Sequence, residues 1–230
     1  MAHIVRDSFS DPGVTEQEIL DNFVILNEAF EPICAAFEVC EFNYINNFQY
    51  DTLQGNDWAE MQVRFNKNNR INMYFVTAVE GDAICGFATL GGITNLESGG
   101  IVILKGDCVG AGAKTLPHEM GHYFNLYHTF EADANGPSTV SEDEPECSNN
   151  GDLVCDTPAD PFMVGDDVED YVDVDLGCRF ISPLTDSNGE AYVPDVGNYM
   201  SYYPDRCRCG FTYGQYVRMA EHYLSSIGMW

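Results

Sequence analysis

Three of the chain's five histidines fall within one short stretch, HEMGHYFNLYH, which runs from His118 to His128. A helix places residues four apart on one face, so His118 and His122 can bind one zinc ion together. Glu119 lies between them, offset enough for its carboxylate to hydrogen-bond a water on the metal instead of binding the metal. With His128 as the third ligand, a fourth position stays open for that water, and the predicted chemistry is hydrolysis.

His128 reaches the same metal only if the helix ends between His122 and His128 and the chain then turns sharply. Such a turn usually needs a residue in the left-handed region, and Asn125 is the next best choice after glycine. The helix that carries the motif is predicted from Thr115 to Tyr127, with Pro117 near its first turn, where proline is tolerated.

The elements before the motif predict a mixed sheet with one long helix packed on it. Residues 1–5 are a first strand, and residues 15–32 are a helix in which Thr15 and Glu18 form a capping box. Apolar residues of this helix recur on one face, and Pro32 ends it. Further strands are predicted from short runs rich in Val, Ile, Phe and Tyr: FEVCEFNYI (37–45), INMYFVTAV (71–79), ICGFATL (84–90) and GIVILKG (100–106).

The fold class is therefore α+β in a single domain of two lobes. The upper lobe of sheet and helices covers residues 1 to about 125, and the lower lobe covers about 126 to 230. The lower lobe has little periodic pattern until a last helix near residues 211–224. Thr212 and Gln215 form its capping box, and Phe211 can pack on Tyr216 as a hydrophobic staple.

The charge of the chain is strongly negative. It has 10 Lys and Arg against 37 Asp and Glu, a formal charge of −27, which repels nucleic acids and anionic membranes. From Glu131 to Asp175 there are acidic residues but no Lys or Arg. This stretch is either a solvated loop region or a calcium-binding one, since calcium takes carboxylate and carbonyl oxygens.

Nine cysteines in so small a chain indicate an oxidising compartment and disulfides, whose connectivity stays open. An odd number leaves at least one thiol outside these pairs. No apolar run reaches the roughly 18 residues of a membrane span. The N-terminus has no leader-like apolar segment, so we expect a secreted protein whose leader and any pro-segment are absent from this sequence.

The sequence also resembles a known family. HEMGHYFNLYH is similar to the extended zinc motif of metzincin metallopeptidases, with Asn125 where the family pattern has glycine. HTFE, GDLVCDTPAD, VGNYMSYYPDRC and FTYGQYVRM follow in the order and spacing of the pappalysin family, which includes cytophagalysins and ulilysin. The resemblance covers essentially the whole chain. It implies a metzincin-type zincin: a mixed twisted sheet with two long helices, and an irregular, disulfide-tied C-terminal lobe ending in a helix.

The resemblance implies roles for individual residues. His118, His122 and His128 would bind one catalytic zinc ion. Glu119 would be the general base that activates the zinc-bound water and protonates the leaving amine. Met200, in NYMSY, would form the Met-turn beneath the metal, and Tyr202 would stabilise the oxyanion of the tetrahedral intermediate.

The resemblance also implies a specificity residue and a second metal. Asp205 would favour Arg or Lys immediately after the scissile bond, at P1′, unless neighbouring Arg206 folds back and neutralises it. Structural calcium would bind in GDLVCDTP, where the candidate ligands are Asp152, Asp156 and Thr157. Cys207 would be a disulfide cysteine after the Met-turn, and Cys147 and Cys178 would be the pair, or belong to the pairs, that tie the lower lobe.

The sequence therefore predicts a secreted zinc endopeptidase acting on proteins or peptides, with a preference for basic residues. Substrate would lie between the lobes, antiparallel to an edge strand such as residues 84–90. The alternative is a catalytically silent pseudo-peptidase or adhesin that binds zinc and calcium. Glu119 argues against that alternative, because a structural zinc site has no need of a general base.

Overall fold

A computed structural model describes residues 1–81, 84–95, 97–133, 136–137 and 147–226. The chain divides into two compact units, Met1–Asn125 with Ala220–Trp230, and Leu126–Met219. Residues 220–230, predicted to belong to the lower lobe, thus group with the first unit. Each unit is described by itself.

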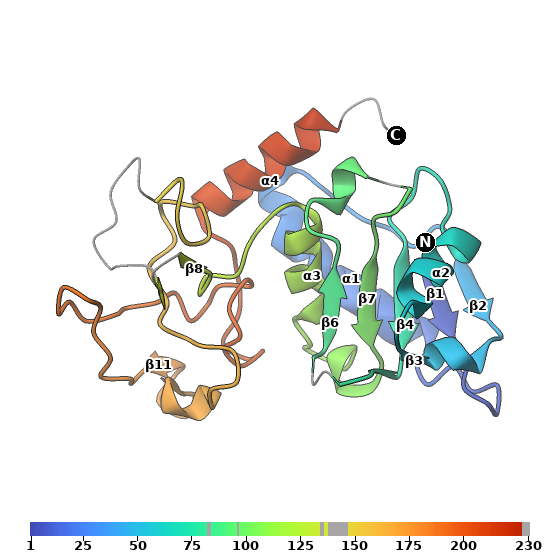
Figure 1. Ribbon diagram of the computed structural model, residues 1–230, viewed down its shortest axis with the longest axis horizontal. Helices are drawn as coiled ribbons and strands as arrows, with labels where there is room; N and C mark the ends of the chain where they lie inside the picture. Colours follow the sequence, from blue (N-terminus) through green and yellow to red (C-terminus); the bar gives the residue numbers. More distant parts are fainter. Residues whose placement is uncertain (82–83, 96, 134–135, 138–146, 227–230) are drawn as a thin grey trace. The chain divides into compact units, whose positions relative to one another are not determined.

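The first unit contains a five-stranded sheet in the order β2-β1-β4-β7-β6 (Figure 1). Neighbouring strands from β2 to β7 pair in parallel, whereas β6 pairs antiparallel with β7 and forms one edge. The predicted mixed sheet is confirmed. Its strands are β1 (Ala2–Val5), β2 (Phe42–Ile45), β4 (Met73–Val76), β6 (Gly86–Ala88) and β7 (Ile101–Leu104). A short separate pair joins β3 (Thr52–Leu53) and β5 (Ala78–Val79).

Helix α1 (Glu16–Phe30) begins as the sequence predicts. The Thr15 hydroxyl accepts a hydrogen bond from the Glu18 N–H, and the Glu18 carboxylate accepts one from the Thr15 N–H. These two bonds satisfy backbone donors that the first turn of a helix leaves without partners. The helix buries its apolar face, and a short 3₁₀ turn, Glu31–Ile33, follows it at the expected proline.

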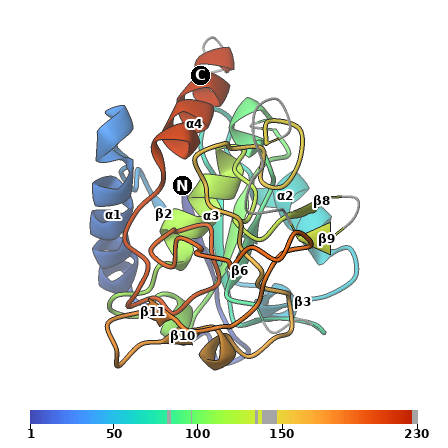
Figure 2. The same cartoon turned by 90° about the vertical axis from the view of Figure 1, so that its left-hand side faces the viewer.

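Both faces of the sheet are covered, which the sequence analysis missed. Phe75 faces α1 and helix α3 (Thr115–Tyr123), whereas its neighbour Tyr74 packs with Met61 of helix α2 (Asp57–Phe65). Figure 2 shows α1 and α3 to one side of the strands and α2 to the other. The predicted long helix on the sheet is present as α1, but the sequence did not predict the shorter helix α2, which buries the second face.

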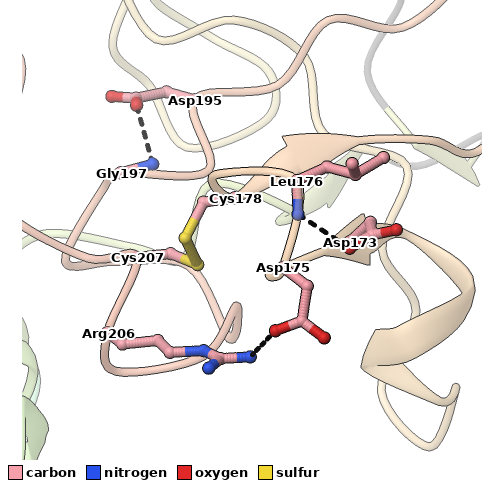
Figure 3. Close-up of a disulfide and its surroundings, with 8 residues drawn as sticks. All are labelled: Asp173, Asp175, Leu176, Cys178, Asp195, Gly197, Arg206 and Cys207. Atoms are coloured by element: carbon pink, nitrogen blue, oxygen red, sulfur yellow. Dashed lines mark hydrogen bonds and ion pairs between the residues drawn. A yellow bond between two sulfur atoms is a disulfide. The ribbon is translucent and has the colours of Figure 1, made fainter.

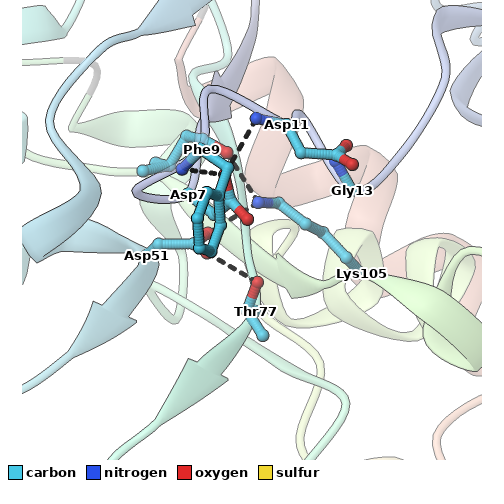
Figure 4. A network of polar contacts seen from close by, with 8 residues as sticks. Asp7, Phe9, Asp11, Gly13, Asp51, Thr77 and Lys105 are labelled. Carbon is cyan, nitrogen blue, oxygen red and sulfur yellow. Dashed lines mark hydrogen bonds and ion pairs between the residues drawn. The ribbon is translucent and has the colours of Figure 1, made fainter.

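A buried ion pair ties the carboxyl ends of three strands together (Figure 4). Lys105 Nζ, just after β7, donates to Asp51 Oδ1 and to the carbonyl of Val5 in β1, each at 2.6 Å. Asp51 Oδ2 accepts from the Thr77 hydroxyl, just after β4, at 2.7 Å. The Lys105 side chain is almost fully buried. Removing one partner of such a pair costs about 3–5 kcal/mol, so this contact holds the sheet end in place.

The second unit has little regular structure and is held by disulfides and one apolar cluster. Its elements are β8 (Ala132–Asp133), β9 (Gly136–Pro137), the 3₁₀ turn Val168–Asp170, β10 (Val172–Asp173) and β11 (Arg179–Phe180). Helix α4 (Tyr213–Ser225) begins here and ends in the first unit. The apolar cluster gathers the buried residues Phe130, Phe162, Tyr171, Val172, Tyr203 and Cys207.

The predicted involvement of Cys147, Cys178 and Cys207 in disulfides is confirmed. They form Cys147–Cys155 and Cys178–Cys207, and Figure 3 shows the second of these. Closing the loop between Cys178 and Cys207 stabilises the fold by about 4 kcal/mol in the entropic account, because the cross-link reduces the conformational freedom of the unfolded chain. Arg206 pairs with Asp175 beside this disulfide at 3.6 Å, but the pair is exposed and therefore weak.

The remaining cysteines lie in different settings. Cys85 and Cys108 form a third disulfide, in the first unit, which joins the residue before β6 to the short 3₁₀ turn Gly106–Cys108 after β7. The structure describes all nine cysteines, and Cys34, Cys40 and Cys209 are exposed and outside the disulfides. Within the described residues, no helix combines the length and the apolar character needed to cross a membrane.

The start of α4 confirms a second predicted cap. The Thr212 hydroxyl accepts from the Gln215 N–H, and the Gln215 side chain accepts from the Thr212 N–H. The rings of Phe211 and Tyr216 lie 5.5 Å apart, as a hydrophobic staple requires.

His3 is buried in the centre of the sheet. Its ring stacks on Tyr74 at 4.4 Å, Nε2 lies 3.0 Å from Asn72 Oδ1, and Nδ1 lies 3.0 Å from the Asn43 side-chain amide nitrogen. This arrangement suits a neutral imidazole that donates from Nε2 and accepts at Nδ1. Burial lowers the pKa of His3 from 6.5 to about 4.

We expect His3 to make the fold acid-sensitive. Its stabilising contribution is complete above pH 6.5 and is lost as pH falls toward 4, because only the unfolded chain then takes up the proton. The loss should approach about 3 kcal/mol in the free energy of unfolding. Urea unfolding between pH 7 and pH 4 measures it, with His3→Gln as the control that cannot titrate. Parallel pH curves for the two proteins would contradict the assignment.

Candidate metal centre

Helix α3 is shorter than the sequence predicts. It ends at Tyr123 instead of Tyr127, and the Phe124 N–H bonds to the carbonyls of Met120 and Gly121. Asn125 follows with φ +75°, and its N–H donates to the His122 carbonyl at 2.8 Å. The left-handed turn predicted at Asn125 is therefore confirmed. The helix stops early because this turn takes the chain away from the helix axis.

The predicted grouping of the three histidines is confirmed. One ligand atom from each of His118, His122 and His128 lies within 4.8 Å of the others. The first two rings, one helical turn apart, have centroids 4.8 Å apart and are nearly perpendicular. No other group of three or more His, Cys, Asp or Glu side chains in the described part of the chain can hold a metal ion. Three imidazoles with an open fourth position suit catalytic zinc.

Glu119 is buried on the same helix, with only 4% of its surface exposed. The edge strand β6 passes close to it at Gly86. A side-chain carbon at position 86 would lie 3.2 Å from Glu119 Cγ and Oε1, and 2.6 Å from the Val102 carbonyl. Only glycine allows this approach. A glycine inside the predicted strand ICGFATL was a signal of such an approach that the sequence analysis did not use.

Gly91, which belongs to the same unit as α3, hydrogen-bonds to the end of this helix. Its N–H donates to the His122 carbonyl at 2.9 Å, and its own carbonyl lies 3.2 Å from His222 Nε2. Gly91 itself has φ +64°. His222 has no metal-binding spacing in the sequence. In the structure it contacts Gly91, which in turn hydrogen-bonds to the backbone of His122.

In the second unit, the segment after His128 is bound to Met200. The Thr129 N–H donates to the Met200 carbonyl at 3.2 Å, and the Met200 N–H donates to Asn198 Oδ1 at 2.9 Å. Met200 is fully buried. Tyr202 lies with its ring 4.8 Å from that of His128 and is 38% exposed, so its phenol is accessible.

Asp160 is a supporting residue that the sequence analysis missed. Its carboxylate, 2% exposed, accepts from the Thr129 hydroxyl at 2.8 Å and from the Tyr203 hydroxyl at 2.7 Å. Burial raises its pKa. Asp160 thereby fixes the residue after His128 and the residue after Tyr202. No spacing rule connects a carboxylate in DTPAD with these two distant positions, so only the fold reveals it.

Asp205 has a partner, but not the one expected. The expected partner was Arg206, whereas Asp205 pairs with Arg208 in the structure and Arg206 pairs with Asp175. The Arg208 guanidinium also donates to the carbonyls of Tyr199 and Ser201, each at 3.3 Å. These backbone acceptors hold Arg208 close to Asp205. The Asp205 side chain stays 40% exposed.

The three calcium candidates have different surroundings. Asp156 caps helix α4, accepting from the Thr212 hydroxyl and the Gly214 N–H at 2.8 Å each. Asp152 is buried and accepts from the Val154 N–H at 3.0 Å. Asp152 Oδ2 and the Thr157 hydroxyl are also buried, and the Thr157 side chain is close enough to the Asp152 carboxylate to oppose the rise in its pKa. Burial raises the pKa of Asp152 to about 7.

Known proteins with similar sequences are metallopeptidases. The profile of peptidase family M43, described as pregnancy-associated plasma protein-A, matches residues 92–223, and that of the reprolysin-like metallopeptidases of family M12B matches residues 24–129. An extracellular metalloprotease of Pyricularia oryzae is 27% identical over 95% of this chain and 72% of its own length. Extracellular metalloprotease 1 of Coccidioides posadasii is 29% identical over 95% and 74%.

The fold is also similar to that of a solved structure. Mature mirolysin of Tannerella forsythia, in complex with a cleaved peptide, superposes with a TM-score of 0.64. It is 19% identical, and the match covers 100% of this chain and 94% of that one. The predicted metzincin-type α+β fold is thereby confirmed.

Proposed function

The chain belongs to the peptidase family of pregnancy-associated plasma protein-A, and from this we propose that it is a zinc endopeptidase in which His118, His122 and His128 bind the metal. One observation carries the proposal: three imidazole ligand atoms lie within 4.8 Å of one another. The buried carboxylate of Glu119 lies on the same short helix. That three-imidazole donor set fits zinc with an open position.

Zinc, when bound, supplies a Lewis acid that polarises the peptide carbonyl and lowers the pKa of water. Glu119 acts as the general base that takes the proton of the attacking water and delivers it to the leaving amide nitrogen. Its burial beneath Gly86 keeps this carboxylate in one position and away from bulk solvent. Tyr202, with its phenol exposed and its ring beside His128, donates a hydrogen bond to the developing oxyanion.

The substrate backbone pairs with strand β6. This strand is the edge of the sheet and pairs on one side with β7, so its other side offers main-chain groups to an extended peptide. Its position at Gly86, against Glu119, supports this choice of edge. The substrate class is therefore proteins or peptides in extended conformation.

Asp205 gives a preference for Arg or Lys at P1′. Its carboxylate is 40% exposed, which leaves room for a second cation beside Arg208. Because the carboxylate is already paired, an incoming Arg or Lys shares it with Arg208. We therefore expect a moderate preference for basic residues instead of an absolute requirement.

Calcium binds at Asp152 and Thr157, with Asp156 nearby in sequence. Two neighbouring buried oxygen atoms, Asp152 Oδ2 and the Thr157 hydroxyl, support this proposal because hard cations select oxygen ligands. Three disulfides and relatives named extracellular metalloproteases support secretion.

The proposed function is tested by asking whether the protein cleaves peptides when zinc is bound, and whether this cleavage requires Glu119. A complex peptide mixture is digested by the zinc-loaded protein, and the cut sites are mapped by mass spectrometry. Glu119→Gln should lower the rate by about 10²–10⁴-fold, because general-base catalysis is lost, while the three histidines still bind zinc. Zinc content of the variant is the control for an intact site.

The same map separates the finer claims. Cuts before Arg or Lys that weaken in Asp205→Asn support the specificity role of Asp205, and another preference would remove that role but retain the peptidase. Full zinc occupancy in the wild-type protein with no cleavage would favour the alternative of a pseudo-peptidase or adhesin.

Calcium should stabilise the zinc-loaded protein through Asp152. A ligand at 100 times its dissociation constant adds about 2.7 kcal/mol to the free energy of unfolding, which appears as a rise in Tm. Asp152→Asn should abolish this rise, whereas the matched variant Asp175→Asn, at an exposed carboxylate, should keep it. Equal calcium responses in both variants would place the ion elsewhere.

A further inference from the structure

A cavity of about 340 Å³ lies in the second unit beside a metal-ligand candidate. Its lining is mostly apolar and consists of His128, Phe130, Glu131, Ala132, Phe162, Met163 and Val164. The size is in the range of ligand pockets, and one side chain of a peptide fits within it. None of the residues given a catalytic or specificity role above, apart from His128, lines it.

The inner wall of this pocket is made of buried, closely packed aromatic rings. Phe130 stacks on His128 with ring centroids 4.6 Å apart and nearly parallel, and it meets Phe162 at 5.1 Å. Both phenylalanines belong to the apolar cluster of the second unit, and the Phe162 N–H is bound to Asp160. The pocket is thus preformed, so a ligand would not have to order its wall.

The outer rim of the pocket is a turn that carries two apolar side chains, although exposed turns are normally polar. Met163 and Val164 are 60% and 77% exposed, in a turn closed by the Asp166 N–H to the Met163 carbonyl at 3.0 Å. Gly165, in the same turn, has φ +103°. Single exposed apolar residues need no explanation, but two neighbours that border an apolar cavity form one continuous surface.

The charge of the lining restricts which class of side chain can bind in the pocket. Among the described residues that line it, Glu131 is the only carboxylate and there is no lysine or arginine, so an acidic side chain meets repulsion from Glu131 with no compensating partner among them. A basic side chain would have to leave water for an aromatic and aliphatic wall, with one partly exposed carboxylate at hand. An aliphatic or aromatic side chain meets neither cost and gains by burial.

The pocket shares His128 with the metal centre, so the side chain that it binds belongs to a substrate residue near the scissile bond. His128 lines the pocket and also belongs to the three-histidine group. An extended peptide advances about 3.3 Å per residue, so a side chain in the pocket is within one or two residues of a carbonyl held at the metal.

We propose that this pocket is a specificity subsite that binds a large apolar side chain of the substrate within two residues of the scissile bond. The inference rests on the proposed peptidase function and is independent of Asp205, which does not line the pocket. Met163 and Val164 are its specificity-determining residues, since they form the rim on which the apolar side chain closes.

The test is the cleavage map of the wild-type protein followed by kinetics on matched peptides. We expect enrichment of Leu, Met or Phe at one position between P2 and P2′. At that position, replacing Leu by Ala should lower kcat/KM by about tenfold or more. Val164→Lys, which places a charge on the rim, should remove most of that difference, because the Leu peptide then loses its apolar contact with the rim.

Two comparisons make the result decisive. Val193→Lys, at an equally exposed valine outside the pocket, should leave both peptides unchanged. Ala132→Phe, which fills the pocket, should reverse the preference toward small residues. Cleavage without apolar enrichment, or enrichment that survives Val164→Lys and Ala132→Phe, would overturn the subsite but not the peptidase. Zinc-loaded protein that cuts nothing would overturn both.

Discussion

The metal centre depends on one backbone reversal, the left-handed turn at Asn125. His118 and His122 are brought together by helix geometry alone, but His128 is six residues beyond His122. A continued helix would move it about 9 Å along the axis from His122. With this turn at φ +75°, a ligand atom of His128 lies within 4.8 Å of the ligand atoms of the other two histidines. The cost of this conformation for a non-glycine residue is about 1–2 kcal/mol, and asparagine is one of the few side chains that adopt it routinely.

Several contacts hold the short helix in place at its end. The His122 carbonyl accepts from both the Asn125 N–H and the Gly91 N–H, so the last turn has no exposed acceptor at this position. Gly91 is in turn bound near His222 of α4. On the other side of the motif, Thr129 is bound to Met200 and to Asp160. The ligand candidates are thus positioned by hydrogen bonds to their neighbours in sequence, and the metal is not the only source of order.

Local signals in the sequence identified most of the elements and the histidine group. The capping boxes at Thr15 and Thr212 and the turn at Asn125 depend on residues within a few positions of each other, and the structure confirms all three. Helix α2 was missed although Trp58, Met61 and Phe65 in DWAEMQVRF recur at helical spacing and pack into one apolar cluster. The strands MYFV and IVIL are apolar at every position, which indicates a sheet covered on both faces and could have led to this helix.

Contacts between distant residues could not be predicted in this way. The pairing of Asp205 with Arg208 depends on which backbone carbonyls hold the guanidinium, and the support of Thr129 and Tyr203 by Asp160 joins positions over thirty residues apart. The pocket beside His128 combines two segments, 128–132 and 162–164, that no periodicity connects. Such features arise from tertiary packing, so the chemistry of the site was accessible from the sequence, whereas its specificity was not.

The most direct measurement of the central claim is X-ray absorption spectroscopy at the zinc edge of the wild-type, zinc-loaded protein. The expected first shell is three imidazole nitrogens and one oxygen at about 2.0–2.1 Å, with one zinc per chain. The number of imidazoles should fall to two in His128→Ala. A shell with sulfur ligands, or one with two imidazoles in the wild-type protein, would contradict the account, because the turn at Asn125 would then not deliver the third histidine to the metal.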